Sequence, residues 1–284
     1  MKLIDGKIIS EHIKQQVIKQ VNEVKEKGIE PCLAVIIVGD DFASRTYVNN
    51  KKKTCDYVGI KSLEFALPAE TTQEELLALV EKLNKDESVH GILCQLPIPK
   101  HIDEKVILNA ISPEKDVDAF HPVNAGHIMI GDSLLKPCTP AGIMEMLKFE
   151  GVEIEGKNCV VMGRSNIVGK PMAMLLINAG GTVTVCNSKT KNLAEVTRNA
   201  DILVVAIGKA KFVTADMVKE GAVVIDVGMD RDENGNRCGD VDFESVKEKA
   251  SHLTPVPGGV GLMTVAMLMQ NTVTAAKMQK IKED

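Results

Sequence analysis

Two side chains suited to acid–base chemistry, Tyr47 and Lys51, are four residues apart in a stretch with helical periodicity. At this spacing they share one face of a helix. A lysine works as a general acid or base near neutral pH only where burial or neighbouring groups lower its pKa. An apolar cleft with a tyrosine beside it would provide such surroundings, so Lys51 is a candidate catalytic residue. The run Lys51-Lys52-Lys53 leaves open the alternative of a solvated basic face.

Three further polar side chains lie near the ends of apolar stretches. Gln95 directly follows 91–94, which is predicted to be a short strand. Because open α/β sheets bind ligands at the carboxyl ends of their strands, Gln95 is placed to orient a ligand. Asp116 and Asp118 would point the same way in an extended chain and could serve a metal or an amine-rich ring. The alternative, which these residues alone favour, is a turn.

A phosphate-binding layout is predicted at 158–171, where a buried strand is followed by a glycine turn and a helix. The pattern Gly163-x-Ser165-x-x-x-Gly169 is one residue longer than the usual dinucleotide fingerprint, with Ser165 at its second glycine. The Ser165 hydroxyl and the Arg164 guanidinium can both donate to a phosphate. The alternative is an ordinary connection between a strand and a helix.

The cofactor expected from the next strand is NADP. That strand ends in Cys186-Asn187-Ser188-Lys189, where an NAD site would carry an acidic residue for the ribose 2′-hydroxyl. Without a carboxylate to repel it, a 2′-phosphate could contact Ser188, Arg164 and Lys189.

The elements that must position these residues alternate between strands and helices in both halves of the chain, which predicts an α/β protein with two domains. The second domain is expected to be a Rossmann-like, doubly wound parallel sheet. The predicted strands are 32–38, 60–67, 91–94, 159–162, 182–186, 201–206 and 222–227. The predicted helices are 8–25, 42–57, 72–83, 104–110, 141–148, one that starts at 168, and the Met-rich 262–281.

The domain ranges follow from a segment without clear periodicity, 116–140, which is rich in Pro, Gly, Asp and His. It is expected to be a linker, so residues 1–137 form the catalytic domain and 138–261 the cofactor domain. Residues 262–284 are expected to return as a helix that packs on the first domain. A capping box is predicted at Thr71 and Glu74.

The composition argues against several classes of protein. A net charge of −5, no Trp and only 2 Tyr argue against nucleic acid or an anionic membrane as a partner. The sequence has no secretory signal and no 18-residue apolar run, so we expect a cytoplasmic protein that does not span a membrane. Its 7 Cys contain no C-x-x-C and its 6 His no H-E-x-x-H, so no metal is expected.

Six motifs occur in order along the chain: Tyr47-x-x-x-Lys51, Gly91-Ile-Leu-Cys-Gln-Leu-Pro97, Lys115-Asp-Val-Asp118, Pro137-Cys-Thr-Pro140, Gly163-Arg-Ser-x-Ile-Val-Gly169-x-Pro171 and Pro255-Val-Pro-Gly-Gly-Val-Gly261. With these motifs the chain resembles the bifunctional methylenetetrahydrofolate dehydrogenase/methenyltetrahydrofolate cyclohydrolase family of the bacterial FolD type. The resemblance extends over 44–264.

The resemblance implies NADP-dependent oxidation of 5,10-methylenetetrahydrofolate to the methenyl form, followed by hydrolysis to 10-formyltetrahydrofolate. It implies Lys51 as the central catalytic residue, with Tyr47 beside it, Gln95 holding its ammonium and Asp118 binding the pterin ring. It also implies a homodimer paired through the cofactor domains. The implied NADP-binding residues are Gly163, Arg164, Ser165, Ser188 and Met229, and the implied substrate-binding residues are Tyr47, Asp118, Pro257, Gly258, Gly259 and Val260.

Two positions depart from the family pattern, which usually has glycine where this chain has Ala119 and proline where it has Leu262. Both are near ligand-binding elements, so they bear on affinity and loop stiffness more than on the type of reaction. Two other functions stay open. One is a monofunctional NAD-dependent dehydrogenase of the same fold. The other is a non-enzymatic module that senses a dinucleotide, in which the catalytic motif would be idle.

Overall fold

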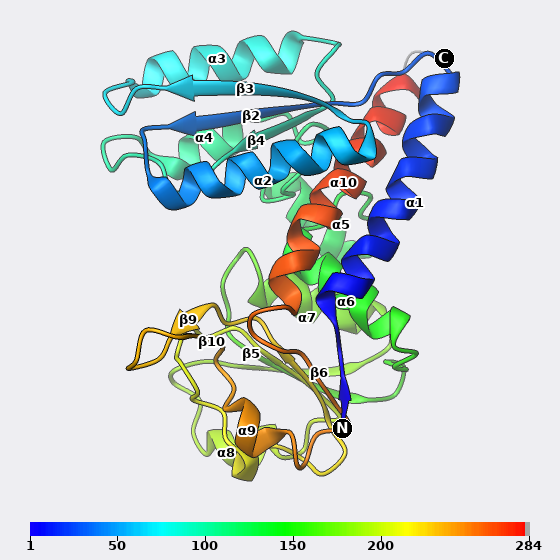
Figure 1. The fold of residues 1–284 in the computed structure, drawn as a ribbon, viewed down its shortest axis with the longest axis vertical. Helices are drawn as coiled ribbons and strands as arrows, with labels where there is room; N and C mark the ends of the chain where they lie inside the picture. The colour runs from blue at the N-terminus through cyan, green and yellow to red at the C-terminus, as the bar shows by residue number, and fades with distance from the viewer. Residues whose placement is uncertain (282–284) are drawn as a thin grey trace. The chain divides into compact units, whose positions relative to one another are not determined.

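The computed structural model describes residues 1–281, which form two compact units (Figure 1). The three-stranded unit combines His12–Cys138 with the chain from Val265 onward, and the six-stranded unit combines Met1–Glu11 with Thr139–Thr264. Both units alternate strands and helices, so the predicted α/β class is confirmed. The predicted domain ranges 1–137, 138–261 and 262–284 stay a prediction.

The three-stranded unit is built on a parallel sheet in the order β3 (Lys61–Leu67), β2 (Cys32–Val38), β4 (Gly91–Cys94). All seven residues of β2 are buried, because helices cover both faces of the sheet. On one face, alternate β2 residues pack with α3 (Gln73–Lys85) and α4 (Glu104–Ala110). Helix α2 (Phe42–Val58) packs on β2 and β3, and Figure 1 shows it on the side of the sheet opposite α3.

The long helices α1 (Gly6–Glu26) and α10 (Met263–Ile281) lie near the ends of the described chain. Helix α10 packs back on the three-stranded unit as predicted: Asn271 Nδ2 donates to the carbonyls of Val117 and Lys136, both at 2.8 Å. Gln279 Nε2 donates to the His90 carbonyl at 2.9 Å. No helix within residues 1–281 is both long enough and apolar enough to cross a membrane.

Two details of this unit correct the sequence predictions. The segment expected to be an irregular linker contains α5 (Pro122–Ile130), which has Pro122 in its first turn and ends at Gly131 in the left-handed conformation. The capping box of α3 is formed by Thr72 and Glu75, one residue later than predicted. Thr71 instead donates its hydroxyl to the Pro68 carbonyl at 2.7 Å.

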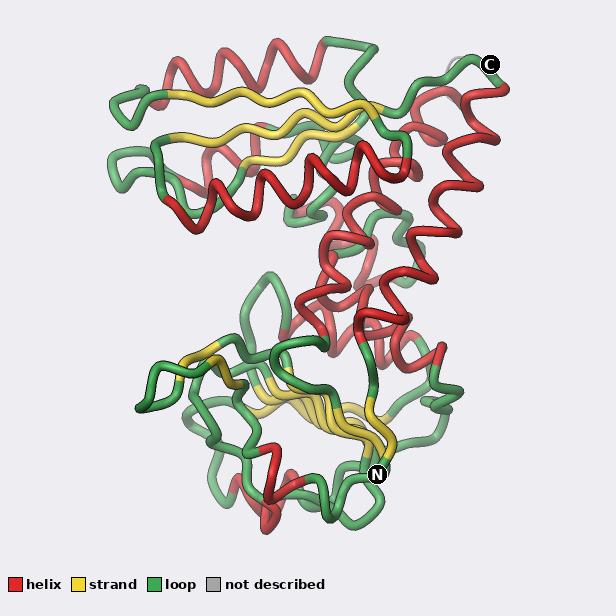
Figure 2. The backbone as a smooth tube through the Cα atoms, viewed as in Figure 1, coloured by secondary structure: helices red, strands yellow, loops and turns green. Residues whose placement is uncertain are grey.

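The six-stranded unit has a parallel sheet whose order does not follow the sequence. The order is β1 (Lys2–Leu3), β11 (His252–Leu253), β8 (Val223–Asp226), β7 (Ile202–Val205), β5 (Asn158–Met162) and β6 (Thr182–Cys186). Figure 2 shows these strands side by side in yellow. The remaining elements are α6 (Cys138–Phe149), α7 (Gly169–Asn178), α8 (Leu193–Thr197), α9 (Phe243–Val246), the hairpin β9 (Asp230–Arg231) and β10 (Arg237–Cys238), and the 3-10 turns Ala215–Met217 and Val260–Leu262.

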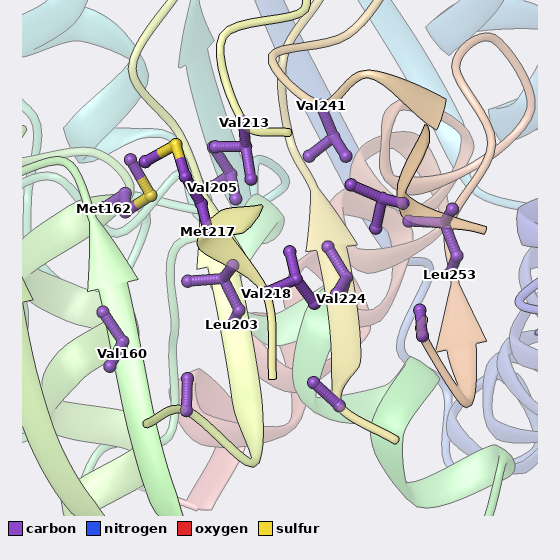
Figure 3. Packing of buried hydrophobic residues seen from close by; sticks show 14 of the residues in the cluster. Val160, Met162, Leu203, Val205, Val213, Met217, Val218, Val224, Val241 and Leu253 are labelled. Carbon is purple, nitrogen blue, oxygen red and sulfur yellow. The ribbon is translucent and has the colours of Figure 1, made fainter. Parts of the chain in front are cut away.

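The core of this unit is a cluster of buried side chains from the central strands and the loops that cover one face of the sheet (Figure 3). Among its members are Val160, Met162, Leu203, Val205, Val213, Met217, Val218, Val224, Val241 and Leu253. Helix α7 packs against β5 and β6. The predicted doubly wound parallel sheet is therefore confirmed.

The strand order defines a place for a ligand. From β5 the chain proceeds to β6 on one side, and then returns to β7 on the other side of β5. The loops that follow β5 and β7 thus leave the sheet in different directions. In open parallel sheets, ligands bind beyond the carboxyl ends of the strands at such a point.

Candidate active site

Lys51 and Gln95 meet in the three-stranded unit. Lys51 lies on α2, and its Nζ donates to Gln95 Oε1 at 2.8 Å. The Gln95 backbone N–H continues the sheet ladder just beyond β4 by donating to the Ile36 carbonyl at 2.8 Å. Its side-chain Nε2 donates to the Leu96 carbonyl at 2.6 Å. Because its amide nitrogen is engaged in this way, the Gln95 side chain presents its oxygen to the lysine.

Asp118 lies close to the same lysine. Its carboxylate is half-buried, and the Cys138 thiol is 3.9 Å from Asp118 Oδ1. Burial raises the pKa of Asp118 to about 6, and the positive charge of Lys51 opposes that shift. An acid, an amide and an ammonium are therefore grouped at the carboxyl end of β4. Tyr47, one turn before Lys51 on α2, is 45% exposed.

Asp116 and Asp118 have separate tasks, because the chain turns between them. The Ala119 N–H donates to the Asp116 carbonyl at 3.0 Å, so the turn is the correct interpretation and the extended alternative is wrong. Asp116 is buried and accepts the His121 backbone N–H at 2.7 Å and Asn124 Nδ2 at 3.0 Å. Through these bonds α5 anchors the turn that carries Asp118.

The departure at Ala119 falls at a strained position. Its φ is +57°, in the left-handed region where only glycine is free of a steric penalty. The family's usual glycine would fit this conformation without cost. At the second departure, the Leu262 N–H donates to the Gly259 carbonyl at 3.2 Å, a bond that a proline could not make.

In the six-stranded unit, the turn after β5 is closely packed against its surroundings. Gly163 has a φ of +124°, and a Cβ there would overlap the Ala206 carbonyl oxygen. A Cβ at Gly169 would overlap the Gly163 carbonyl. Ser165 Oγ accepts the N–H groups of Val168 at 3.1 Å and Gly169 at 3.3 Å. The Ser165 oxygen is thus fixed at the N-terminus of α7, and its hydroxyl hydrogen stays available to a phosphate.

Arg164 and Ser188 follow neighbouring strand ends. Met162 of β5 pairs with Cys186 of β6, so each of the two residues comes two positions after a paired strand end. Both side chains are exposed. A guanidinium and a hydroxyl at adjacent strand ends fit a phosphate group, and no carboxylate occurs at the end of β6.

The other two predicted cofactor and substrate elements lie on loops of the same unit. Met229 is 66% exposed and directly follows Gly228. In the loop after β11, Pro257 is exposed, whereas Gly259 and Val260 are buried. The Gly258 carbonyl accepts the Gly6 N–H at 2.9 Å, which ties this loop to the start of α1. The Val260 side chain therefore serves packing, and the exposed part of the loop is at Pro257.

The thiols and acids of the described chain suggest no metal centre. All seven cysteines are buried and none is in a disulfide. Within residues 1–281, no group of three or more His, Cys, Asp or Glu side chains could hold a metal ion. Three buried polar residues, Asp226, Asp240 and Asn271, were not predicted to have a role. Asp226 could have been found from its position at the end of an apolar strand. No local pattern marks the other two.

Comparisons with known proteins point to one family. The family model for the tetrahydrofolate dehydrogenase/cyclohydrolase catalytic domain matches residues 4–118, and the model for the NAD(P)-binding domain of the same family matches 137–280. The chain is 62% identical to the bifunctional protein FolD of Agathobacter rectalis over 97% of this chain and 99% of that protein.

Solved structures agree with these matches. The bifunctional FolD enzyme of Campylobacter jejuni is 54% identical, with a TM-score of 0.95 over 98% of this chain and 99% of that one. The Trypanosoma brucei dehydrogenase-cyclohydrolase, solved with NADP and an inhibitor, is 41% identical, with a TM-score of 0.91 over 97% of both chains.

Proposed function

The chain belongs to the tetrahydrofolate dehydrogenase/cyclohydrolase family, and we propose that the two groups of residues described above carry out both reactions of a FolD enzyme. The first reaction oxidises 5,10-methylenetetrahydrofolate to 5,10-methenyltetrahydrofolate. The second hydrolyses that product to 10-formyltetrahydrofolate. NADP supplies the hydride acceptor when bound, while the protein supplies orientation and electrostatics.

The observation that carries the proposal is the contact between Lys51 Nζ and Gln95 Oε1 at 2.8 Å, with Asp118 in the same group. Hydrolysis of a methenyl cation removes a proton from water and adds one to a ring nitrogen. Lys51 is positioned by Gln95 to exchange these protons. Tyr47 lies on the same helix face and would line the substrate site.

Asp118 would hold the pterin ring. A carboxylate can accept two parallel N–H bonds from an amino-pyrimidine ring, as it does from a guanidinium. The turn anchored by Asp116 and α5 fixes its backbone. Both reactions need the substrate held, so Asp118 would serve both.

NADP would lie at the carboxyl edge of the six-stranded sheet. Arg164, Ser165 and Ser188 would contact its phosphate groups, while Gly163 keeps the turn close to the sheet. Met229 would contribute a backbone contact. The missing carboxylate after β6 disfavours the NAD-dependent alternative. A non-enzymatic module that senses a dinucleotide would not need the contact between Lys51 and Gln95.

Three finer points belong to the same proposal. The loop Pro257-Gly258-Gly259-Val260 would border the substrate and the nicotinamide through its exposed part. The protein would act as a homodimer paired through its cofactor domains. It would work in the cytoplasm, where the reduced state of its seven buried thiols is the usual one.

The test is the variant Lys51→Gln, assayed by NADPH formation and by the absorbance of methenyltetrahydrofolate. Hydride transfer moves no proton to or from the carbon, so dehydrogenase activity is expected to stay measurable. Cyclohydrolase activity is expected to fall about 10²–10⁴-fold, because glutamine cannot exchange a proton usefully. The methenyl product should then accumulate.

The matched control is Lys52→Gln, which alters an exposed neighbour on the same helix. It should leave both activities intact. Hydrolysis at the wild-type rate in Lys51→Gln would remove this lysine from the mechanism. Loss of both activities in a folded variant would mean that Lys51 chiefly positions the substrate.

A further inference from the structure

Asp240 is fully buried, and its carboxylate binds the loop that follows β7. Oδ2 accepts the N–H groups of Ile207 at 2.7 Å and Gly208 at 3.2 Å, and Oδ1 accepts that of Lys209 at 2.6 Å. Three successive backbone donors thus converge on one carboxylate. Such bonds are stronger than those between neutral groups, so the path of this loop depends on Asp240.

Asp226, the last residue of β8, holds the segment that carries Asp240. Its Oδ1 accepts the N–H groups of Gly228 at 2.9 Å and Asp240 at 3.0 Å, and its Oδ2 accepts that of Val241 at 2.9 Å. One carboxylate therefore joins two stretches of chain. The first leads to Met229, and the second contains the carboxylate that binds the loop after β7.

The close approach of these stretches requires glycine at two positions. A Cβ at Gly239 would overlap the Asp226 carboxylate, and a Cβ at Gly228 would overlap the Asp240 backbone nitrogen. The two carboxylates and the two glycines form one buried assembly beyond the carboxyl ends of β7 and β8. Neither carboxylate is among the groups proposed above to carry out the two reactions.

This assembly lies where the sheet changes direction. The loop after β7 begins at Ala206, whose carbonyl is in close contact with Gly163 of the turn after β5. The loops after β5 and β7 are the two that leave the sheet in different directions, where ligands bind in open parallel sheets. The loop held by Asp240 is therefore one wall of the proposed dinucleotide site, and the turn with Arg164 and Ser165 is the other.

We propose that Asp240 and Asp226 are positioning residues for the dinucleotide: together they fix the loop after β7 and the residues around Met229 in the shape that binds NADP. Neither carboxylate has to touch the cofactor, because their oxygens are occupied by backbone N–H groups. This inference rests on the proposed function, in which NADP binds at this edge of the sheet.

The experiment compares Asp240→Asn with the wild type by measuring KM for NADP, kcat of the dehydrogenase reaction, and hydrolysis of supplied methenyltetrahydrofolate. Asparagine keeps one acceptor oxygen but turns an NH₂ group toward a backbone donor. We expect KM for NADP to rise about tenfold or more, the effect of losing a charge-assisted bond. The kcat at saturating NADP and the hydrolysis, which needs no hydride acceptor, should change far less.

Asp201→Asn is the matched control, since Asp201 also binds a backbone N–H, that of Asn158 at 2.9 Å, but at the amino edge of the same sheet. It should leave KM for NADP unchanged. Asp226→Asn is the second variant, with the same expected direction, in case Asp240→Asn does not fold.

An unchanged KM for NADP in both folded variants would overturn the inference, as would a parallel loss of hydrolysis. If the wild-type protein itself showed no NADP-dependent oxidation, the proposed function would fail instead.

Discussion

Asp118 shows how strongly the surroundings of a single residue determine its chemistry. Asp116, two positions away, is also a buried acid, yet its Oδ2 already accepts both the His121 backbone N–H and Asn124 Nδ2. Asp118 has a thiol beside it and the charge of Lys51 nearby. Of the two carboxylates, Asp118 is therefore the one that can still receive donors from a substrate.

The first prediction concerns the pH dependence of Asp118. Burial raises its pKa to about 6, so the carboxyl is neutral below that pH and ionised above it. Only the ionised form accepts two N–H bonds from the pterin. KM for methylenetetrahydrofolate is therefore expected to rise as pH falls below about 6, by up to about tenfold per pH unit, when measured at saturating NADP.

The variant Asp118→Asn should show a high KM that varies little between pH 5 and 7. A wild-type KM that stays constant over this range would show that Asp118 does not bind the substrate in its ionised form.

Arg164 carries the second prediction at this scale. The Arg164→Ala variant loses a guanidinium that would meet the 2′-phosphate, and a charge-assisted hydrogen bond contributes about 1.5–3 kcal/mol. Affinity for NADP, measured by titration of the purified protein, should fall by about ten- to hundredfold. Affinity for NAD, which lacks that phosphate, should change little. Equal losses for both dinucleotides would remove Arg164 from the 2′-phosphate site.

At the scale of elements, helix α10 contributes to the candidate site through one buried side chain. Asn271 Nδ2 donates to the carbonyls of Val117 and Lys136, so the helix holds the chain directly before Asp118 and before Cys138. No other residue type of this size offers two amide hydrogens and a neutral charge. The contact connects residues 154 positions apart.

The third prediction follows from this contact. Asn271→Leu keeps the number and branching of the side-chain heavy atoms but leaves two buried carbonyls without a donor, each at a cost of about 1–3 kcal/mol. We expect the free energy of unfolding to fall by about 2–4 kcal/mol and KM for the folate to rise, because Asp118 loses its support. Urea unfolding and steady-state kinetics measure the two effects.

Thr274→Ala is the control for this prediction, since the Thr274 hydroxyl donates only within α10, to the Gln270 carbonyl at 2.9 Å. A variant Asn271→Leu with wild-type KM and reduced stability would limit Asn271 to a folding role.

Local patterns predicted most of the elements. The predicted limits of β2, β4 and β6 are correct, since each apolar run is bounded by proline, glycine or polar residues. Helix α5 was missed because a nine-residue helix among Pro, Gly and His residues shows little periodicity. Its Pro122 and Gly131 were usable signals of a start and an end.

The residues of the candidate site were likewise predicted only in part. Local patterns marked Lys51, Gln95 and Asp118 as separate candidates, and the resemblance to a family supplied their roles in one site. Their grouping depends on three separate elements that no spacing rule connects. Asp240 could not be predicted, because its partners, the N–H groups of 207–209, are 31–33 residues away and carry no side-chain signal. Backbone donors held by a distant carboxylate are visible only in the folded chain.

For the whole molecule, the ends of the described chain complete the two units. Strand β1 pairs with β11, so residues 2 and 3 form one edge of a sheet built mostly from 158–253. The opposite edge is β6, which has a neighbour on one side only. An exposed strand edge of this kind is a template for pairing with a second chain unless it is protected.

The last prediction locates the proposed dimer at this edge. Val185 on β6 is 40% exposed and Ile177 on the neighbouring helix α7 is 47% exposed, so apolar side chains lie beside the unpaired edge. Val185→Lys places a charge there, and two such charges would face each other across a symmetric contact. We expect the mass measured by light scattering to halve. The melting temperature should also lose its dependence on protein concentration, since dimer formation stabilises by mass action.

Met129→Lys, a change to an exposed side chain on α5, is the control and should leave the mass unchanged. A Val185→Lys protein that stays dimeric would place the contact on another surface, and a wild-type monomer would contradict the dimer itself.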